Sequence, residues 1–231
     1  MKNYIPELYN FFAELSAHNN REWFAANRQR YERLRKLWME DIDRMIDRMK
    51  EWEPGLDNQS AATCVYRINR NLRFSQDKTP YKTHFGASIH VGGRRCGNAG
   101  YYLDIGYPGE YESGLYGGLW QVEPAMLRKL RHAIVDNIEE FEEIVNAPDM
   151  LRDFPGWCSS TLKTIPKGWD RNHPQAEYLR MTNYGKMRPC PESFYLDPDW
   201  ALRSADLFHT LKPFIDFINY SMTEEVWSIG D

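Results

Sequence analysis

A cation-rich segment over residues 67 to 84 holds the side chains best suited to chemistry. It contains five Lys or Arg residues and one acid, Asp77. Arginine presents planar, bidentate donors to carboxylate or phosphate, and lysine adds a mobile point charge. Because unpaired charge is costly to bury, such a loop either faces water or meets an anion. We therefore predict a pocket for a phosphorylated or carboxylated ligand, with these binding residues: Arg67, Arg70, Arg73, Ser75, Lys78, Tyr81, Lys82, His84 and Tyr102.

The positive charge of this region contrasts with the rest of the chain. Residues 67 to 95 hold seven Lys or Arg and one acid, a local charge of +6, whereas all 231 residues together carry a formal net charge of -4. Like charges repel, so a local concentration of them indicates an anion or a partner carboxylate. The acidic total argues against a general nucleic-acid coat and against a polybasic membrane anchor.

His84 is the candidate of this segment for proton transfer. It follows Lys82 at strand spacing, and the side chains of Asp104, Tyr102 and Glu112 are candidate partners from neighbouring strands. A lone histidine in a strand more often has a structural role. The sequence has no nucleophile-elbow, zinc-protease or paired-carboxylate motif, so it selects no reaction class and leaves open whether the protein is an enzyme.

The sequence indicates neither a metal site nor a cofactor. His84 and His90 would lie about 20 Å apart on a strand that rises about 3.3 Å per residue, too far to share an ion. No phosphate-loop or dinucleotide glycine motif accompanies the cations. The four cysteines are far apart and form no C-x-x-C pair, so we expect free thiols; they are Cys64, Cys96, Cys158 and Cys190.

The elements around this segment predict an α+β fold, with an antiparallel meander sheet packed against an N-terminal helix pair and C-terminal helices. Helical spacing predicts helices over residues 5–18, 21–52, 123–137, 139–145 and 201–221, with Pro213 kinking the last. Alternation predicts strands over 64–69, 85–91, 100–105, 112–120 and 178–184. Residues 146–175 are predicted to be an irregular connection. With no repeat and no boundary between two cores, we expect a single domain over residues 1–231.

The predicted strand over residues 85–91 has one apolar face, formed by Phe85, Ala87, Ile89 and Val91, which we expect to be buried. Ten of the fifteen glycines lie between residues 86 and 118. Glycine weakens a strand, so this density favours bulges and close packing over a ligand that lies on the sheet.

The sequence predicts no membrane partner. It has no apolar run of about 18 residues, which excludes a membrane-spanning helix. Pro6, Glu7 and Glu14 interrupt the first fifteen residues, which therefore lack an export signal. We expect a cytoplasmic protein.

Several motifs match a known family. They are Asn19-Asn20-Arg21-Glu22-Trp23-Phe24, Arg73-Phe74-Ser75, Asp77-Lys78-Thr79-Pro80-Tyr81-Lys82-Thr83-His84-Phe85-Gly86, Gly117-Gly118-Leu119-Trp120 and Pro166-Lys167-Gly168-Trp169-Asp170. With them the chain resembles the uncharacterised family called domain of unknown function 2461 over nearly its whole length. The resemblance implies one conserved unit, found in bacteria and fungi. It implies no activity and no catalytic residues.

Three functions remain open at this point. The first is the small-anion pocket, with or without catalysis. The second is a single-stranded nucleic-acid surface, less favoured, in which bases stack on aromatic residues beside the cations; these are Tyr66, Phe74, Tyr81, Tyr101 and Tyr102. The third is a structural or regulatory protein whose cations form internal ion pairs, for example with acids of the N-terminal helices.

Overall fold

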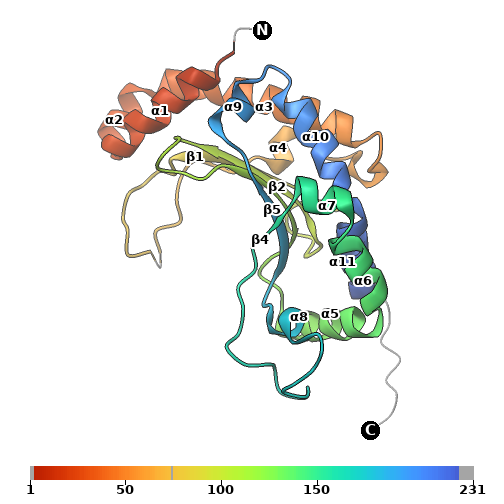
Figure 1. Cartoon of the computed structure of the whole chain (residues 1–231). Coiled ribbons are helices and arrows are strands. Elements are labelled where there is room, and N and C mark those ends of the chain that lie inside the picture. Colours follow the sequence, from red (N-terminus) through yellow and green to blue (C-terminus); the bar gives the residue numbers. More distant parts are fainter. Residues whose placement is uncertain (1–2, 74, 224–231) are drawn as a thin grey trace. The chain divides into compact units, whose positions relative to one another are not determined.

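The computed structural model describes residues 3–73 and 75–223, and Figure 1 shows their helices and strands. Within these ranges the strands form an antiparallel sheet in the order β1-β2-β3-β5-β4. The strand bounds are β1 His84–Ile89, β2 Gly100–Gly106, β3 Gly114–Leu119, β4 Gly156–Trp157 and β5 Tyr184–Pro189. The α+β class and the central meander are therefore confirmed.

Helices precede and follow the meander along the chain. Those before it are α1 Ile5–Ala17, α2 Arg21–Ala26, α3 Arg28–Met49, the short 3-10 helix η1 Pro54–Leu56 and α4 Ala61–Cys64. Those after it are α5 Pro124–Asp136, α6 Ile138–Val145, α7 Pro148–Asp153, α8 Ala176–Arg180, α9 Glu192–Leu196, α10 Trp200–Thr210 and α11 Lys212–Thr223. None of the helices in the described ranges is both long enough and apolar enough to cross a membrane.

The chain forms two compact units, each assembled from three separated segments. Unit 1 comprises Met1–Cys96, Tyr101–Leu115 and Pro189–His209, and unit 2 comprises Gly97–Gly100, Tyr116–Arg188 and Thr210–Asp231. The segments change unit within strands β2, β3 and β5, so neither unit is a continuous stretch of sequence. The single domain over residues 1–231 stays a prediction.

The core of unit 1 lies between the apolar face of β1 and β2 and the N-terminal helices (Figure 1). Phe85 packs edge-on against Phe12 of α1, with ring centroids 5.1 Å apart, and in a tilted arrangement against Trp38 of α3, at 5.9 Å. Ala87 and Ile89 are fully buried on the same face. The register predicted from alternation is thus confirmed for these three strand residues, whereas Val91 lies beyond the end of β1 and is half-buried.

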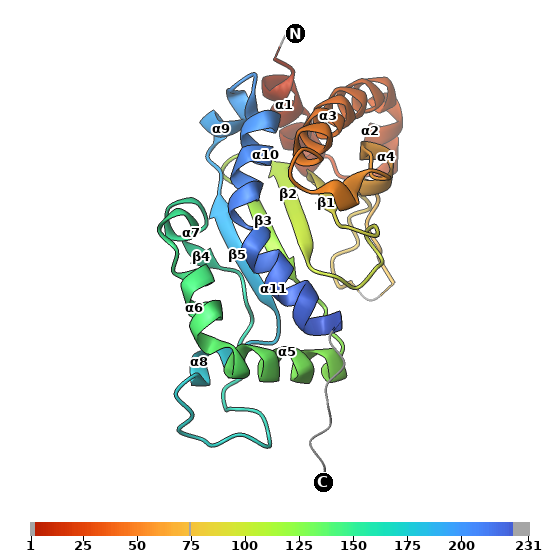
Figure 2. The same cartoon turned by 90° about the vertical axis from the view of Figure 1, so that its right-hand side faces the viewer.

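The core of unit 2 is built on the helices α5, α6 and α11, which Figure 2 shows together. Phe141 of α6 contacts Phe214 and Phe217 of α11, with ring centroids 6.2 and 5.3 Å apart. Phe214 also packs edge-on against Trp157 of β4. Trp157 lies opposite Lys186 in the sheet, and the Lys186 side chain is 1% exposed, with its ammonium 4.6 Å from the Trp157 ring centroid.

The helix predicted over residues 21–52 is two helices, α2 and α3, which separate at Asn27. Asn20 caps α2, because its side chain accepts a hydrogen bond from the Trp23 N–H at 2.8 Å. At Asn27 the backbone leaves helical geometry, and the side-chain amide donates to the Trp23 carbonyl oxygen at 3.0 Å. Asparagine competes for backbone partners in this way, which favours helix ends over helix interiors.

The helix predicted over residues 201–221 also divides, into α10 and α11. Pro213 is the second residue of α11. At the first turn of a helix a missing N–H has no partner to lose, and the fixed φ of proline suits the helix start. Pro213 therefore belongs to the start of a new helix and does not kink a continuous one.

Two predicted strands are wrong. Residues 61–64 form the helical turn α4, which opens with a capping box between Ser60 and Thr63. The residues that follow join the sheet only through isolated bridges, at Val65 and Asn69. Within the predicted strand 178–184, residues up to Arg180 belong to the helix α8.

The sheet resumes later than predicted. Strand β5 starts at Tyr184 and runs through Arg188 to Pro189, beyond the end of the predicted strand. Proline is tolerated there because it is the last strand residue and need not donate to the ladder. The connection predicted to be irregular over residues 146–175 also contains the helix α7 and the strand β4.

Candidate functional site

The cation-rich segment forms a long loop in unit 1 that leads into β1 (Figure 1). Its two arms run side by side near the sheet. The Lys82 N–H donates to the Ile68 carbonyl oxygen at 2.8 Å, and the Arg70 N–H donates to that of Pro80 at 2.9 Å. These hydrogen bonds hold the arms together although neither arm is a regular strand.

Asn19, which follows α1, fixes the base of this loop. Its side-chain amide donates to the Tyr81 carbonyl oxygen at 2.9 Å and accepts from the Tyr81 N–H at 3.1 Å. The Tyr81 ring stacks on Phe24 of α2, with centroids 4.0 Å apart and planes inclined by 16°. The N-terminal motif and the loop motif therefore meet at Tyr81.

The outer part of the loop is held by an internal ion pair. The Arg70 guanidinium donates to the carboxylate of Asp77 and to the hydroxyl of Thr79, and it reaches the Ser75 hydroxyl at 3.3 Å. The Thr79 backbone N–H and then Arg70 lower the pKa of Asp77 to about 2. For Arg70 and Ser75 the internal ion-pair interpretation fits the geometry.

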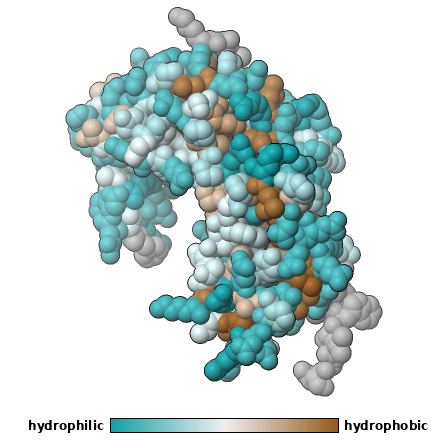
Figure 3. All heavy atoms as spheres, viewed as in Figure 1, coloured by the Kyte–Doolittle hydropathy of each residue, from teal (hydrophilic) through white to brown (hydrophobic). Residues whose placement is uncertain are grey.

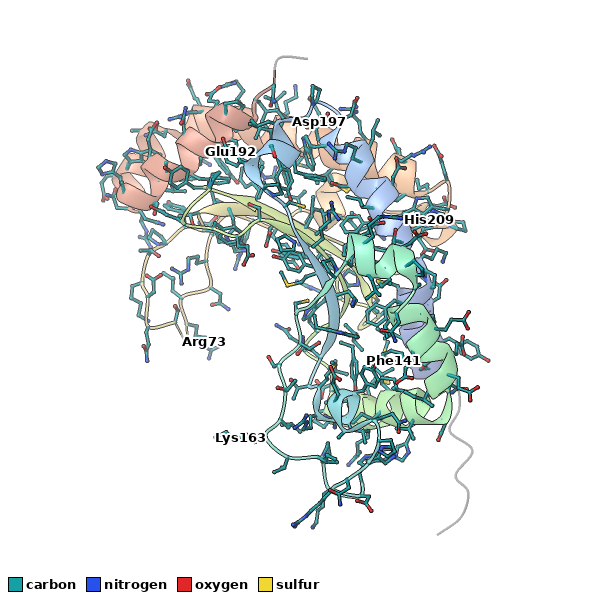
Figure 4. All side chains as sticks on the ribbon, in the orientation of Figure 1. Arg73, Phe141, Lys163, Glu192, Asp197 and His209 are labelled. Atoms are coloured by element: carbon teal, nitrogen blue, oxygen red, sulfur yellow. The ribbon has the colours of Figure 1, made fainter. Side chains whose placement is uncertain are left out.

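Two further predicted binding residues lie on the exposed outer loop. The Lys78 ammonium donates to the Leu72 carbonyl oxygen at 3.2 Å. Arg73 lies near the end of the loop farthest from β1 (Figure 4), in a part of the surface covered by hydrophilic side chains (Figure 3). Phe74, proposed to stack on bases, lies outside the described residues.

A cleft of about 410 Å³ opens between the base of the loop and the sheet. Its lining residues are Ser16, Asn19, Arg70, Asp77, Thr79, Tyr81, Lys82, Thr83, His84 and Tyr111. Four predicted binding residues are therefore brought together, namely Arg70, Tyr81, Lys82 and His84. The others do not line this cleft: Arg67, Arg73, Ser75, Lys78 and Tyr102.

His84 forms one wall of the cleft with Tyr111, which sequence analysis missed. The imidazole stacks on the phenol ring, with centroids 4.4 Å apart and planes inclined by 21°. Tyr111 lies so close to Gly106 that a Cβ atom there would be 2.5 Å from its ring. Burial, with a smaller contribution from Lys82, lowers the pKa of His84 to about 4. His84 is therefore a neutral imidazole at neutral pH.

Behind this wall lies a buried acid, Asp104. Its carboxylate accepts hydrogen bonds from the Tyr111 hydroxyl at 2.6 Å and from the Gly114 N–H at 3.0 Å. Burial raises the pKa of Asp104 to about 6, although both hydrogen bonds favour the ionised form. Asp104 pairs with Gly86 in the register of β1 and β2, so it lies on the same sheet face as His84.

The glycine-rich strands leave room for aromatic rings. A Cβ atom at Gly86 would lie 2.8 Å from the Tyr102 hydroxyl oxygen, just as one at Gly106 would meet the Tyr111 ring. Close packing, the favoured interpretation of the glycines, is confirmed at these two positions. Tyr102 belongs to this packing, and its ring lies edge-on to Tyr66 at 6.3 Å.

Lys82 and Arg94 meet at the Tyr66 ring, and the charge of Arg67 acts on the Lys82 ammonium; we call Arg67, Lys82 and Arg94 the cation cluster. The Lys82 ammonium and the Arg94 guanidinium each lie 5.0 Å from the centroid of the Tyr66 ring. Burial, followed by the charges of Arg67 and Arg94, lowers the pKa of Lys82. Within the described ranges no Asp or Glu forms an ion pair with any member of the cluster.

The proposed base-stacking residues are differently placed. Tyr101 is 1% exposed in the core, so its proposed stacking on a base is wrong. Tyr81 already stacks on Phe24, and the Tyr66 ring has two cations beside it. Arg94 was counted in the local charge but not assigned to the site, because only the fold brings it to Tyr66.

Comparison with known proteins gives a family but no characterised relative. No curated protein matches the chain, and no solved structure matches it. The model of the family described as "Conserved hypothetical protein (DUF2461)" matches residues 7–217. This range spans both units and includes the loop, the cleft and the cation cluster. The chain therefore belongs to the family of conserved hypothetical proteins DUF2461.

Proposed function

We propose that the cleft of unit 1 binds a small anionic ligand, phosphorylated or carboxylated, through Lys82. The observation that carries the proposal is the electrostatic environment of Lys82. This half-buried ammonium lines the cleft, and the charges that act on it, Arg67 and Arg94, are both positive. Repulsion among them is relieved by an anion in the cleft.

The surroundings of Lys82 suit such a ligand. Thr83 and Ser16 place hydroxyl groups on the cleft, and hydroxyls can donate to an anion. The neutral imidazole of His84 adds a hydrogen-bonding group without adding charge. A volume of about 410 Å³ lies within the range typical of small-molecule pockets.

The alternative, that the cations form internal ion pairs, applies to a different part of the loop. Arg70 is neutralised by Asp77, so it needs no external anion. Lys82 has no such partner among the described residues. We therefore assign anion binding to Lys82 and a loop-fixing role to Arg70.

Urea unfolding with and without inorganic phosphate or acetate tests this proposal. A bound anion should raise the free energy of unfolding by about 2.7 kcal/mol at a hundredfold excess over its dissociation constant. The Lys82→Met variant, which keeps the aliphatic stem but removes the charge, should lose most of this stabilisation.

Lys163→Met is the matched control, because it removes one positive charge from an exposed loop of unit 2 (Figure 4). It should bind anions like the wild type. Equal loss in both variants would show a non-specific charge effect and refute the site. A single-stranded oligonucleotide whose affinity falls steeply with salt while neither small anion binds would favour the nucleic-acid surface instead.

A further inference from the structure

The cation cluster has more positive charge than one carboxylate can offset. Lys82 and Arg94 lie at equal distances of 5.0 Å from the Tyr66 ring centroid. Their charges are therefore within about 10 Å of each other, roughly one Debye length in 0.1 M salt. Arg67 acts on the same ammonium. The three positive charges are therefore close enough to repel one another, most strongly at low salt.

The acids nearest to the cleft are engaged elsewhere. Asp77 is paired with Arg70, and the Asp104 carboxylate is held by Tyr111 and by the Gly114 N–H. Glu110 accepts a hydrogen bond from Ser16 at 2.7 Å. A ligand must therefore supply the negative charge that the cluster lacks.

Building on the proposed anion site, we infer that its ligand presents a dianionic phosphate group, as in a phosphate monoester, in preference to a single carboxylate. A carboxylate offsets one of the three charges of Arg67, Lys82 and Arg94, whereas a phosphate dianion offsets two. Of the three cations only Lys82 lines the cleft, so it would contact the phosphate directly, and Arg67 and Arg94 would act on it through their charge.

The inference depends on the proposed function, and a pH series separates the two. Methyl phosphate, sulfate and acetate are titrated at pH 5 and pH 7. With a second pKa of about 6, methyl phosphate is about one tenth dianion at pH 5 and about nine tenths at pH 7. Sulfate stays a dianion over this range, so it corrects for titration of protein groups such as Asp104.

For a site that selects the dianion, the ratio of methyl phosphate affinity to sulfate affinity should rise about ninefold from pH 5 to pH 7. At pH 7, methyl phosphate should bind at least about tenfold more tightly than acetate, given the doubled charge. Arg94→Met should reduce methyl phosphate affinity more than acetate affinity, and Lys163→Met should change neither.

The outcomes distinguish the two claims. If the ratio of methyl phosphate affinity to sulfate affinity does not change with pH, or if acetate binds as tightly as methyl phosphate, the preference for a dianion is refuted. The proposed anion site is not affected by that result. No Lys82-dependent binding of any of the three probes overturns both. Because the pH series uses the wild-type protein, it decides the question even if Arg94→Met fails to fold.

Discussion

Replacing Asp104 with Asn tests the electrostatics of the wall behind the cleft. Burial raises the pKa of this carboxyl group from 3.8 to about 6. Between these pH values the folded state binds more protons than the unfolded state, so stability falls as the pH rises. A pKa shift of about two units corresponds to a destabilisation of the folded state by about 3 kcal/mol, which is complete above about pH 7. The side chain of the Asp104→Asn variant cannot ionise, so the variant does not lose this stability as the pH rises.

Urea unfolding of the wild type and the variant at pH 4 and pH 7 measures the effect. The difference in unfolding free energy should move in favour of Asp104→Asn by about 2.4 kcal/mol from pH 4 to pH 7, since the rest of the effect lies below pH 4. Effects of other acids, such as Asp77, are common to both proteins and cancel. Asp57→Asn, at an exposed position of unit 1, controls for the loss of one negative charge. A difference that does not change with pH refutes a raised pKa for Asp104.

Three further predictions concern other parts of the molecule. Lys186→Met should raise Tm by at least about 2 °C at pH 7, because it removes a buried ammonium whose pKa is lowered by burial. The gain should shrink as the pH approaches 10.5, and a variant less stable than the wild type at pH 7 would contradict the reasoning. Asn19→Ala removes two hydrogen bonds to the Tyr81 backbone. It should therefore cost about 1 to 3 kcal/mol and speed amide exchange across the loop, and unchanged exchange would count against its anchoring role. Thiol titration of the denatured, unreduced protein should return four thiols for Cys64, Cys96, Cys158 and Cys190, and any lower number would contradict the predicted absence of disulfides.

Local patterns predicted the elements whose signals are local. The alternation around Phe85 gave the register of β1, and a helix does start at residue 21 as predicted, where Asn20 caps α2. Side-chain periodicity and capping both depend on neighbours in sequence. The strand expected over residues 64–69 was wrong because Cys64 ends the helical turn α4 and the residues after it join the sheet only through isolated bridges. Strand propensity alone does not show whether Cys64 ends a helical turn or starts a strand.

For the candidate site, the sequence predicted some of the residues that line the cleft but not the residues that surround them in space. The count of charges found the region, and Lys82 and His84 do line a common cleft. Their decisive neighbours, Tyr111 and Arg94, come from later in the chain and reach the site only through the pairing of β1 with β2 and the turns that follow these strands. Spacing along the sequence does not encode such contacts.

The pKa of the Lys82 ammonium is the most direct test of the proposed anion site. It can be followed by NMR of the lysine side-chain carbons, with Lys82→Met to assign the signal. In the absence of anions the pKa should lie below the ordinary value of 10.5, because of burial and the charges of Arg67 and Arg94. Added inorganic phosphate should raise it again, since a bound anion stabilises the charged form. A Lys82 pKa that phosphate leaves unchanged would contradict the account.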